Sequence, residues 1–432
     1  MTVPDISVVV PYFERQDQLD RLLAGLDRQS LPAEAFELVV ADDGSRQAPS
    51  IGPRRYPTRV VRQEDSGFRL AQARNLGAAA STGRVIAFVD QDCVPGPDYL
   101  RLVRQAASSP WSLVVGHRVH AALTGWPEPA LSAWLSGDGP PPPSLPEPLW
   151  LLRRYARTEA LTKPDDHAYQ LVIGAALSLH RELFAHLGGF DPTFRAYGGE
   201  DWDLGHRAYV AGADLRWQAD AVVWHDGPDF GGRPVDLVGM KNDETFVLAR
   251  RVPDPDVRGT HLVWRVPRIV VRLRACDAPR ALLVAAIESL LAGADAHVWV
   301  EDGDAGTDLV SVLEDPRVHL GSPPADVMAR SAYTTQCDPV VLLGGTLHDL
   351  EASTPIEGPG FRMISIRDEN RSRRGVPAPP AGPWPDGVQL EPLPRGLQLE
   401  RHWQQLRLRA DDRRPASLST PTSPGDLATT MP

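Results

Sequence analysis

The chain has 432 residues, of which 42% are hydrophobic and 23% charged, and its formal net charge is −11. These proportions are close to those of globular proteins, and the length predicts two or three domains. They exclude a wholly disordered, collagen-like or coiled-coil chain. The acidic balance argues against non-specific nucleic-acid binding, which needs a basic surface, so we expect no nucleic-acid partner.

The three cysteines, Cys93, Cys276 and Cys337, form no CxxC pair, so neither a zinc cage nor a disulfide framework is indicated. This usage is typical of a reducing cytoplasm. The first residues lack the basic stretch of a signal peptide. The longest apolar run, 281–293, is interrupted by Glu288 and is too short to span a bilayer. We therefore expect no transmembrane segment and a cytoplasmic protein, or one peripheral at the inner face of a membrane.

The first part of the chain alternates the patterns of strands and helices. Apolar runs of strand length are followed by Leu- and Ala-rich stretches at helical spacing. This order predicts an α/β fold with a parallel sheet and helices on both faces. The expected strands are 6–10, 37–41, 58–62 and 84–89, and the expected helices are 19–26 and 70–80.

Changes in composition divide the chain into domains. Residues 1–250 form the first predicted domain, with a Pro-rich stretch at 124–148 that we expect to be a surface excursion. A second βα pattern predicts a smaller α/β domain over 260–400. The Ser-, Thr- and Pro-rich residues 410–432 predict a disordered tail.

The second domain echoes the first in its order of elements. The stretches that begin at Ile6 and Arg268 both read as strand, helix, strand and acidic turn. The shared order of elements has two explanations. The second domain is a degenerate repeat of the first, or the two stretches are alike only because any two βαβ units are alike. In the second copy, Gly344, Gly345 and Thr346 take the place of an acidic strand end. We therefore expect this domain to be non-catalytic and to serve acceptor docking or self-association.

Acidic residues follow two of the predicted strands. Asp42 and Asp43 come after the second strand, and Asp90 and Asp92 after the fourth. Because ligands bind outside the carboxyl ends of parallel strands, both pairs are expected at one edge of the sheet. Two carboxylates one residue apart can hold a divalent cation and leave positions for phosphate oxygens. Asp residues also form turns, and an isolated pair would need no other explanation.

The predicted helix between these pairs carries three polar residues. Arg69 and Arg74 have guanidinium groups that match phosphate geometry, and Asn75 adds an amide donor. Arg69 lies near the helix start, where anions are favoured, so it is the better candidate for a diphosphate. For Arg74, a solvated helix face is a serious competing explanation.

A further cluster, Gly198, Gly199, Glu200, Asp201 and Trp202, opens a later helix. The glycines free the backbone to approach a ligand, and the helix dipole favours an ionised carboxylate, which suits a general base. Simple N-terminal capping would explain one of the acidic residues but not the whole cluster.

Together these motifs resemble the inverting family-2 glycosyltransferases with the GT-A fold, and most of all their chondroitin-polymerase and galactosyltransferase-type branch. GT-A is a nucleotide-diphospho-sugar transferase fold with a Rossmann-like mixed sheet. The resemblance covers residues 1 to about 250. The matching stretches are VVVPYFER (8–15), VVADDGS (39–45), GFRLAQARNLG (67–77), FVDQDCVP (88–95), GGFDPTFRAYGGEDWDLGHRA (188–208) and WHDG (224–227).

The resemblance implies where a nucleotide would bind. Pro11, Phe13 and Glu14 would border the nucleoside. Asp43, alone or with Asp42, would bind the base, which is typically uracil in this family.

The resemblance also implies the surroundings of the diphosphate. Arg69 and Asn75 would lie near it, and Asp90 would face the donor sugar or the ribose. Asp92 and His225 would hold a divalent cation, Mn²⁺ or Mg²⁺. A neutral imidazole is a suitable ligand for such an ion, whereas a lone His after a strand would otherwise be an ordinary surface residue.

At the later helix, the resemblance makes Asp201 the general base and Glu200 a contact of the acceptor or donor sugar, in a loop with Gly198, Gly199 and Trp202. The implied reaction moves a sugar from a nucleoside-diphosphate sugar, typically a UDP-sugar, to an acceptor hydroxyl with inversion. Glycan, lipid, peptide and small-molecule acceptors are all compatible.

Two other function classes stay open beside the transferase. A pseudoenzyme that binds sugar nucleotides or glycans is one, although intact Asp92, Asp201 and His225 weigh against it. A nucleotidyltransferase is the other. It would carry a Gly-rich basic loop after the first strand, which VPYFERQ (10–16) lacks.

Overall fold

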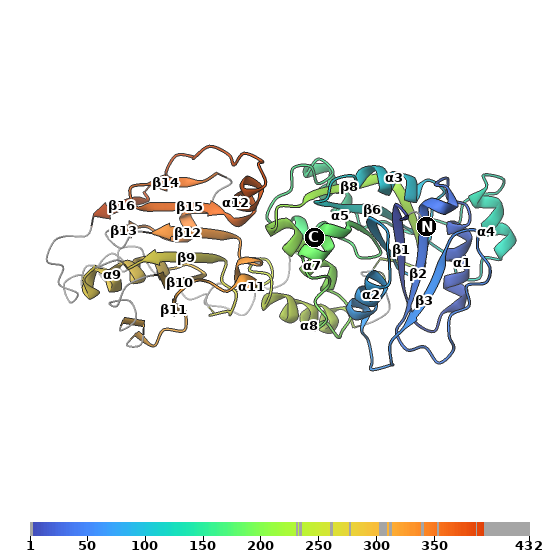
Figure 1. The fold of residues 1–432 in the computed structure, drawn as a ribbon, viewed down its shortest axis with the longest axis horizontal. Helices are drawn as coiled ribbons and strands as arrows, with labels where there is room; N and C mark the ends of the chain where they lie inside the picture. Colours follow the sequence, from blue (N-terminus) through green and yellow to red (C-terminus); the bar gives the residue numbers. More distant parts are fainter. Residues whose placement is uncertain are drawn as a thin grey trace, which may run out of the picture.

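The computed structural model describes residues 3–392 except 230–231, 233–235, 260–261, 276–277, 302–308, 311–312, 338–340, 352–353 and 386. Its described part contains two large sheets, each with its own hydrophobic core, that follow one another along the long axis of the molecule (Figure 1). The predicted tail, 410–432, lies outside the described residues.

The first sheet has eight strands within the described residues, in the order β3-β2-β1-β4-β7-β6-β8-β5. β1 pairs in parallel with β2 and β4, and β2 pairs in parallel with β3, whereas β4 and β7 are antiparallel. The expected α/β fold with a mixed sheet is therefore confirmed. The strands are β1 (Ile6–Tyr12), β2 (Phe36–Asp42), β3 (Thr58–Arg62), β4 (Val85–Val89), β5 (Cys93–Pro95), β6 (Ser112–Ala121), β7 (Ala176–His180) and β8 (Asp214–Asp226).

Alternate side chains of β1 supply the cores on the two faces of this sheet. Val8 and Val10 share one core with the leucines of α1, whereas Val9 shares the other with α2. A Cβ on Gly77 of α2 would lie 2.4 Å from the Val9 side chain, so glycine is needed for this close packing. The helices are α1 (Gln16–Leu26), η1 (Ala33–Ala35), α2 (Leu70–Ala79), α3 (Tyr99–Ala106), α4 (Glu128–Leu135), α5 (Leu149–Arg157), η2 (Ala168–Leu171), α6 (Arg181–His186), α7 (Glu200–Val210) and α8 (Leu237–Ala249).

The Pro-rich stretch 124–148 differs from the surface excursion that its composition predicts. It contains α4, whose Leu131 and Leu135 are buried in a small core with Ala24 of α1 and Val94 of β5. Residues four apart lie on the same face of a helix, so these two leucines give α4 an apolar face that covers part of the first domain.

The second sheet has six strands within the described residues, in the order β11-β10-β9-β12-β15-β14. β9 is parallel to β10 and β12, β10 is parallel to β11, and β15 is antiparallel to β12 and β14. This is the order and direction of β3-β2-β1-β4-β7-β6 in the first sheet. The elements are β9 (Ile269–Arg274), α9 (Arg280–Leu291), β10 (Ala296–Glu301), β11 (Val318–Leu320), α11 (Ala325–Met328), β12 (Tyr333–Cys337), β13 (Val341–Gly344), η4 (Leu347–Leu350), β14 (Ile356–Gly358), β15 (Phe361–Ser365), α12 (Ile366–Arg373) and β16 (Gln389–Pro392).

One expected correspondence between the two sheets is wrong. The apolar run 340–343, which ends at Gly344, was expected to be the counterpart of β4. Instead β13 pairs with β16 in a separate two-stranded sheet, and β12 lies beside β9. The sequence of β12, YTTQC, is too polar to stand out as a buried strand, and its place in the sheet identifies it. Residues 338–340, which follow β12, lie outside the described residues.

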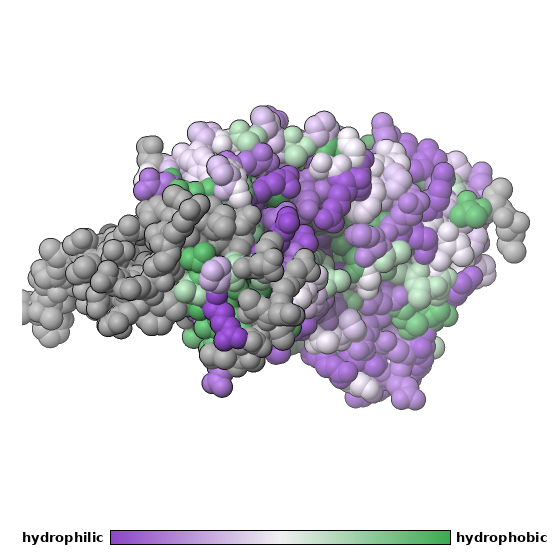
Figure 2. Space-filling view, turned by 60° about the vertical axis from the view of Figure 1, so that its left-hand side comes forward, coloured by the Kyte–Doolittle hydropathy of each residue, from purple (hydrophilic) through white to green (hydrophobic). Residues whose placement is uncertain are grey.

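Within the described residues, no helix is long and apolar enough to cross a membrane. On the face shown in Figure 2, hydrophilic residues dominate the coloured surface and apolar residues form small patches.

Candidate active site

A cavity of about 550 Å³ opens at the carboxyl edge of the first sheet. Among the residues that line it are Pro11, Phe13, Asp43, Asp90 and Asp92. Since β1, β2 and β4 run in parallel, the polar residues that follow them reach the same edge. The structure thus brings together five of the residues that the sequence marked as candidates.

The two acidic residues after β2 have different surroundings. Asp43 lines the cavity and accepts hydrogen bonds from the Gln63 side chain (2.6 Å) and the Arg69 backbone N–H (3.0 Å). Asp42 is fully buried, and its Oδ1 accepts from the backbone N–H of Ser45 at 2.9 Å. Asp42 therefore closes the turn after β2 and, unlike Asp43, is not among the residues that line the cavity, so it is not placed to join Asp43 at a base.

Glu14 and Arg69 hold loops around the cavity. The Glu14 side chain accepts from the backbone N–H of Arg46 at 2.7 Å, and its own N–H donates to Ser45 Oγ at 3.0 Å. The Arg69 guanidinium lies 3.5 Å from Asp43 Oδ1, so it balances the charge of that carboxylate. Neither Glu14 nor Arg69 is among the residues that line the cavity.

Asn75 has a different role from the expected one near the diphosphate. Its Nδ2 donates to the Phe190 carbonyl at 2.8 Å, and its Oδ1 accepts from the Phe190 N–H at 2.9 Å. A Cβ on Gly189 would lie 2.7 Å from Asn75 Oδ1, so the contact is tight. Asn75 therefore fastens the Gly-Gly-Phe-Asp loop to α2.

Arg74 is buried, so the competing explanation of a solvated helix face is wrong. Its side chain is 1% exposed, and it forms two ion pairs of 2.8 Å, one with Asp90 and one with Glu200. These carboxylates raise the pKa of the guanidinium against the effect of burial. The signal was present in the sequence: Ala71 and Ala78 lie three and four residues away on α2, and their small side chains mark its buried face.

The loop before α7 depends on two glycines. Gly198 and Gly199 have φ angles of +94° and +88°, in the left-handed region that favours glycine. A Cβ on Gly198 would lie 2.9 Å from the carboxylate of Glu244 on α8. Glu244 also pairs with Lys241 at 2.8 Å, and the Lys241 ammonium lies 4.4 Å from the centre of the Trp202 ring. Helix α8 therefore covers the loop that leads to the acidic residues.

The two carboxylates at the start of α7 have different partners. Glu200 accepts from Arg74, whereas Asp201 accepts from the backbone N–H groups of Gly174 (2.9 Å) and Trp202 (2.8 Å). Burial raises the pKa of both carboxyl groups, and the neighbouring Asp201 charge adds to the rise at Glu200. Asp201 is thus held in place by its own surroundings and is a stronger base than an exposed Asp.

The two expected metal ligands lie next to each other. His225 Nε2 is 3.3 Å from Asp92 Oδ2, because Cys93 of β5 pairs with His225 of β8. The other ring nitrogen, Nδ1, faces the Gly227 carbonyl at 3.3 Å, which leaves Nε2 for a ligand. An imidazole and a carboxylate are donors that Mn²⁺ accepts, so the residues fit such an ion and leave further positions for phosphate oxygens and water.

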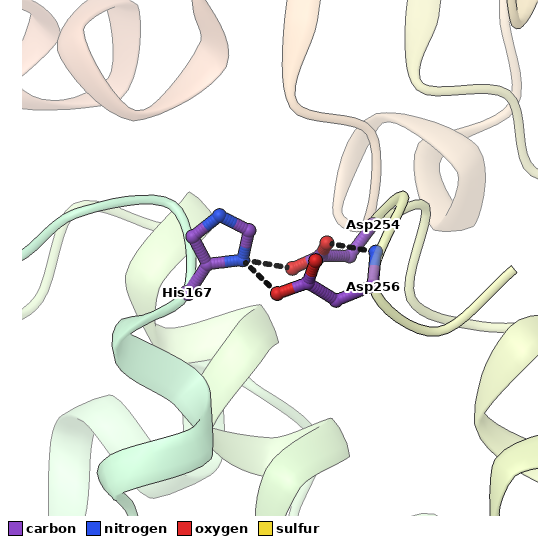
Figure 3. A group of neighbouring side chains, drawn as sticks. All are labelled: His167, Asp254 and Asp256. Carbon is purple, nitrogen blue, oxygen red and sulfur yellow. Dashed lines mark hydrogen bonds and ion pairs between the residues drawn. The ribbon is translucent and has the colours of Figure 1, made fainter. Parts of the chain in front are cut away.

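His167, Asp254 and Asp256 form another group whose ligand atoms lie within 4.8 Å of one another (Figure 3). His167 Nδ1 lies 2.7 Å from Asp254 and 3.3 Å from Asp256, and the hydrogen bond to Asp254 raises the pKa of His167. Both carboxylates face the same nitrogen, which is the arrangement of an ion pair. This ion pair fastens residues 254–256 to His167, just before η2. None of the three is among the residues lining the cavity.

Two family models match the part of the chain that builds this site. Residues 7–179 match the model described as "Glycosyl transferase family 2", and residues 154–219 match "N-terminal domain of galactosyltransferase". These ranges include β1 to β4 and α7, so they cover the cavity edge and the acidic helix start.

Individual proteins match over longer stretches. The chain is 33% identical over 236 residues to validoxylamine A glucosyltransferase of Streptomyces hygroscopicus subsp. limoneus, covering 49% of each chain. It is 23% identical over 351 residues to chondroitin synthase of Escherichia coli, covering 74% of this chain and 50% of that one. The chain thus spans about half the length of these curated relatives. A solved mannosyltransferase of Pyrobaculum calidifontis with GDP-Man and Mn²⁺ aligns over 59% of this chain and 67% of that one, with 18% identity and a TM-score of 0.41.

Proposed function

We propose, from its similarity to glycosyltransferase family 2 over residues 7–179, that this chain transfers a sugar from a nucleoside diphosphate to an acceptor hydroxyl with inversion. The observation that carries this proposal is one chain of contacts. Asp90 lines the cavity, Arg74 joins it to Glu200, and Asp201 follows on α7. The buried guanidinium of Arg74 therefore links the donor cavity to the helix that would activate the acceptor.

On the donor side, Pro11, Phe13 and Asp43 would hold the nucleoside of a UDP-sugar. Asp92 and His225 would hold Mn²⁺ or Mg²⁺. A divalent cation there offsets the negative charge that develops on the departing diphosphate.

On the acceptor side, Asp201 would take the proton of the attacking hydroxyl. The new bond joins that oxygen to the anomeric carbon, while the bond to the diphosphate breaks from the opposite face. Its raised pKa makes Asp201 a better proton acceptor near neutral pH. Glu200 accepts a hydrogen bond from Arg74 and would keep the Arg74 guanidinium in place.

Donor binding is tested first, by thermal shift with UDP, GDP, dTDP and CMP, each with and without Mn²⁺. We expect the largest shift with UDP and Mn²⁺. A protein that responds to none of them, alone or with the metal, would contradict the assignment of the cavity.

Catalysis is tested with Asp201→Asn, which keeps the shape of the side chain and removes the proton acceptor. We expect unchanged UDP binding and a fall of about two to four orders of magnitude in transfer or donor hydrolysis. Asp220→Asn, at an exposed position on β8, is the matched control and should behave like the unaltered protein. If the unaltered protein binds donor but never turns it over, the non-catalytic binding function is correct instead.

A further inference from the structure

The last turn of α7 is capped by the second domain. The final carbonyl groups of a helix lack partners within the helix and need donors from elsewhere. Here Arg367 of α12 donates to the carbonyls of Tyr209 (2.8 Å) and Ala213 (3.2 Å), and Asn370 donates to that of Val210 (3.0 Å). Figure 1 shows α12 on the side of the second domain that faces the first.

Two more arginines extend this cap. Arg371 donates to the Gly212 carbonyl (3.3 Å) and to Asp214 (3.1 Å), and Arg374 donates to the same Gly212 carbonyl. A Cβ on Gly212 would lie 2.7 Å from the Arg371 and Arg374 side chains. The two domains therefore meet at atomic contact around the end of α7. Three guanidinium groups lie where the helix dipole favours positive charge.

The first turn of α7 is held by the same domain. The fully buried Asp203 pairs with Arg207 of its own helix at 2.8 Å and with Arg330, which follows α11. The backbone carbonyl of Arg330 lies 2.7 Å from His206 Nε2. Burial lowers the pKa of His206 to about 4, so the ring is neutral and its Nε2–H donates to this carbonyl. Arg330 thus contacts α7 at Asp203, two residues after Asp201, and at His206, in the next turn.

We propose that the second domain is a positioning element that holds α7, and with it Asp201, at the distance from the donor that transfer requires. Arg330 acts at the first turn and Arg367 and Arg371 at the last. An 11-residue helix is a rod of about 16 Å, so a grip on both ends fixes the carboxylate at its start. The inference rests on the proposed role of Asp201 and gives the second domain a part in the reaction without a catalytic group of its own.

These contacts differ from ordinary packing between domains. Their partners in the first domain lie along α7 and just beyond its end: backbone carbonyls between residues 209 and 213, the His206 ring, and the carboxylates of Asp203 and Asp214. The nucleotide side of the cavity is built from β1, β2 and β4, and none of the residues lining it belongs to the second domain. Loss of the cap should therefore affect the reaction and leave nucleotide binding intact.

The test compares single variants in the full-length protein. Arg367→Ala removes one hydrogen bond to Tyr209 of α7 and one to Ala213 just beyond the helix, and Arg367→Lys keeps the charge. Arg373→Ala is the matched control, because Arg373 lies on the same helix but pairs with Glu369 of α12 itself. Binding of UDP with Mn²⁺, kcat for transfer or donor hydrolysis, the melting temperature and hydrogen exchange of residues 200–210 are measured for each.

For Arg367→Ala we expect a kcat at least about tenfold lower, since small misplacements of a reacting group cost about this much or more. The Kd for UDP should stay within about twofold, and exchange in the 200–210 segment should accelerate. Arg367→Lys should recover part of kcat, and Arg373→Ala should change nothing. If Arg367→Ala fails to fold, the more exposed Arg371→Ala answers the same question.

Two results would overturn the proposal. One is an unchanged kcat and unchanged exchange in folded Arg367→Ala. The other is a parallel loss of UDP binding, kcat and melting temperature, which indicates a general structural role. If instead Asp201 is not the base, Asp201→Asn would transfer sugar normally. Hydrogen exchange of residues 200–210 would still report whether α12 holds α7.

Discussion

Replacement of Arg74 by methionine tests the buried cation at the centre of the site. Methionine has a similar length and no charge, so the variant removes two ion pairs of 2.8 Å and leaves two carboxylates without their partner. Removing one member of a buried ion pair costs about 3–5 kcal/mol, because the remaining charge stays desolvated. The Asp90 side chain is 28% exposed and can gain water, whereas the Glu200 side chain is 7% exposed and, since burial already raises its pKa, takes up a proton when Arg74 is lost.

We therefore expect the lower end of that range for Arg74→Met, a loss of about 3 kcal/mol in the free energy of unfolding. In a domain of this size it corresponds to a melting temperature lower by about 6–12 °C. Urea unfolding at pH 7 measures the free energy. The melting temperature is recorded alongside it.

A double-mutant cycle identifies the cause of the loss. Arg74→Met combined with Glu200→Gln has no carboxylate at position 200 that must be desolvated or protonated, so it should regain about half of the stability lost by Arg74→Met alone. Transfer should stay low in Arg74→Met, in Glu200→Gln and in the double variant, since each breaks the link between Asp90 and α7. A coupling energy below about 0.5 kcal/mol between the two positions would refute the argument from charge compensation.

Three further predictions concern the metal, the interface and the loop. Asp92→Asn and His225→Ala should abolish or weaken the Mn²⁺-dependent part of the thermal shift with UDP, and a metal response equal to that of the unaltered protein would contradict their assignment. Between pH 6.5 and 4 the unfolded chain binds a proton at His206 and the folded chain does not, so stability present above pH 6.5 is lost as pH falls, by up to about 3 kcal/mol. Urea unfolding of His206→Gln should not show this loss of stability between pH 6.5 and 4. The same pH dependence in His206→Gln and the unaltered protein would refute the assignment to His206. Gly198→Ala should reduce transfer, because its Cβ would contact Glu244. Gly188 has a similar φ and open space around it, so Gly188→Ala should leave transfer unchanged and cost only about 1 kcal/mol in the free energy of unfolding. Equal losses of transfer in the two variants would contradict the argument.

The central strands and the edge where the site lies could be predicted from the sequence. β1, β2 and β4 are continuous apolar runs that end in polar residues, and a parallel sheet necessarily brings these ends together. The pairing of Asp92 with His225 was implied only by the family resemblance, and the contact itself depends on β5 lying beside β8.

The roles of neighbouring polar residues could not be predicted in the same way. Arg74 and Asn75 are adjacent on α2, and only the rotation of the helix against the sheet decides that Arg74 reaches Asp90 while Asn75 reaches Phe190. Asp42 and Asp43 differ for a similar reason, since successive residues leave a strand in opposite directions. β12 was missed because its sheet neighbours, rather than its own composition, bury it.

The cap on α7 also makes tolerance to mutation unequal on its two sides. The acceptors at positions 209–213 are backbone carbonyls, which every amino acid possesses, so most substitutions there leave the hydrogen bonds available. Gly212 is the exception, because any side chain would collide with the arginines. The donors are side chains, so each change at Arg367, Asn370 or Arg371 removes bonds directly. Changes on α12 should therefore weaken this interface by removing hydrogen bonds, whereas changes at the buried Val210 and Ala213 should act through their own packing and leave these bonds in place.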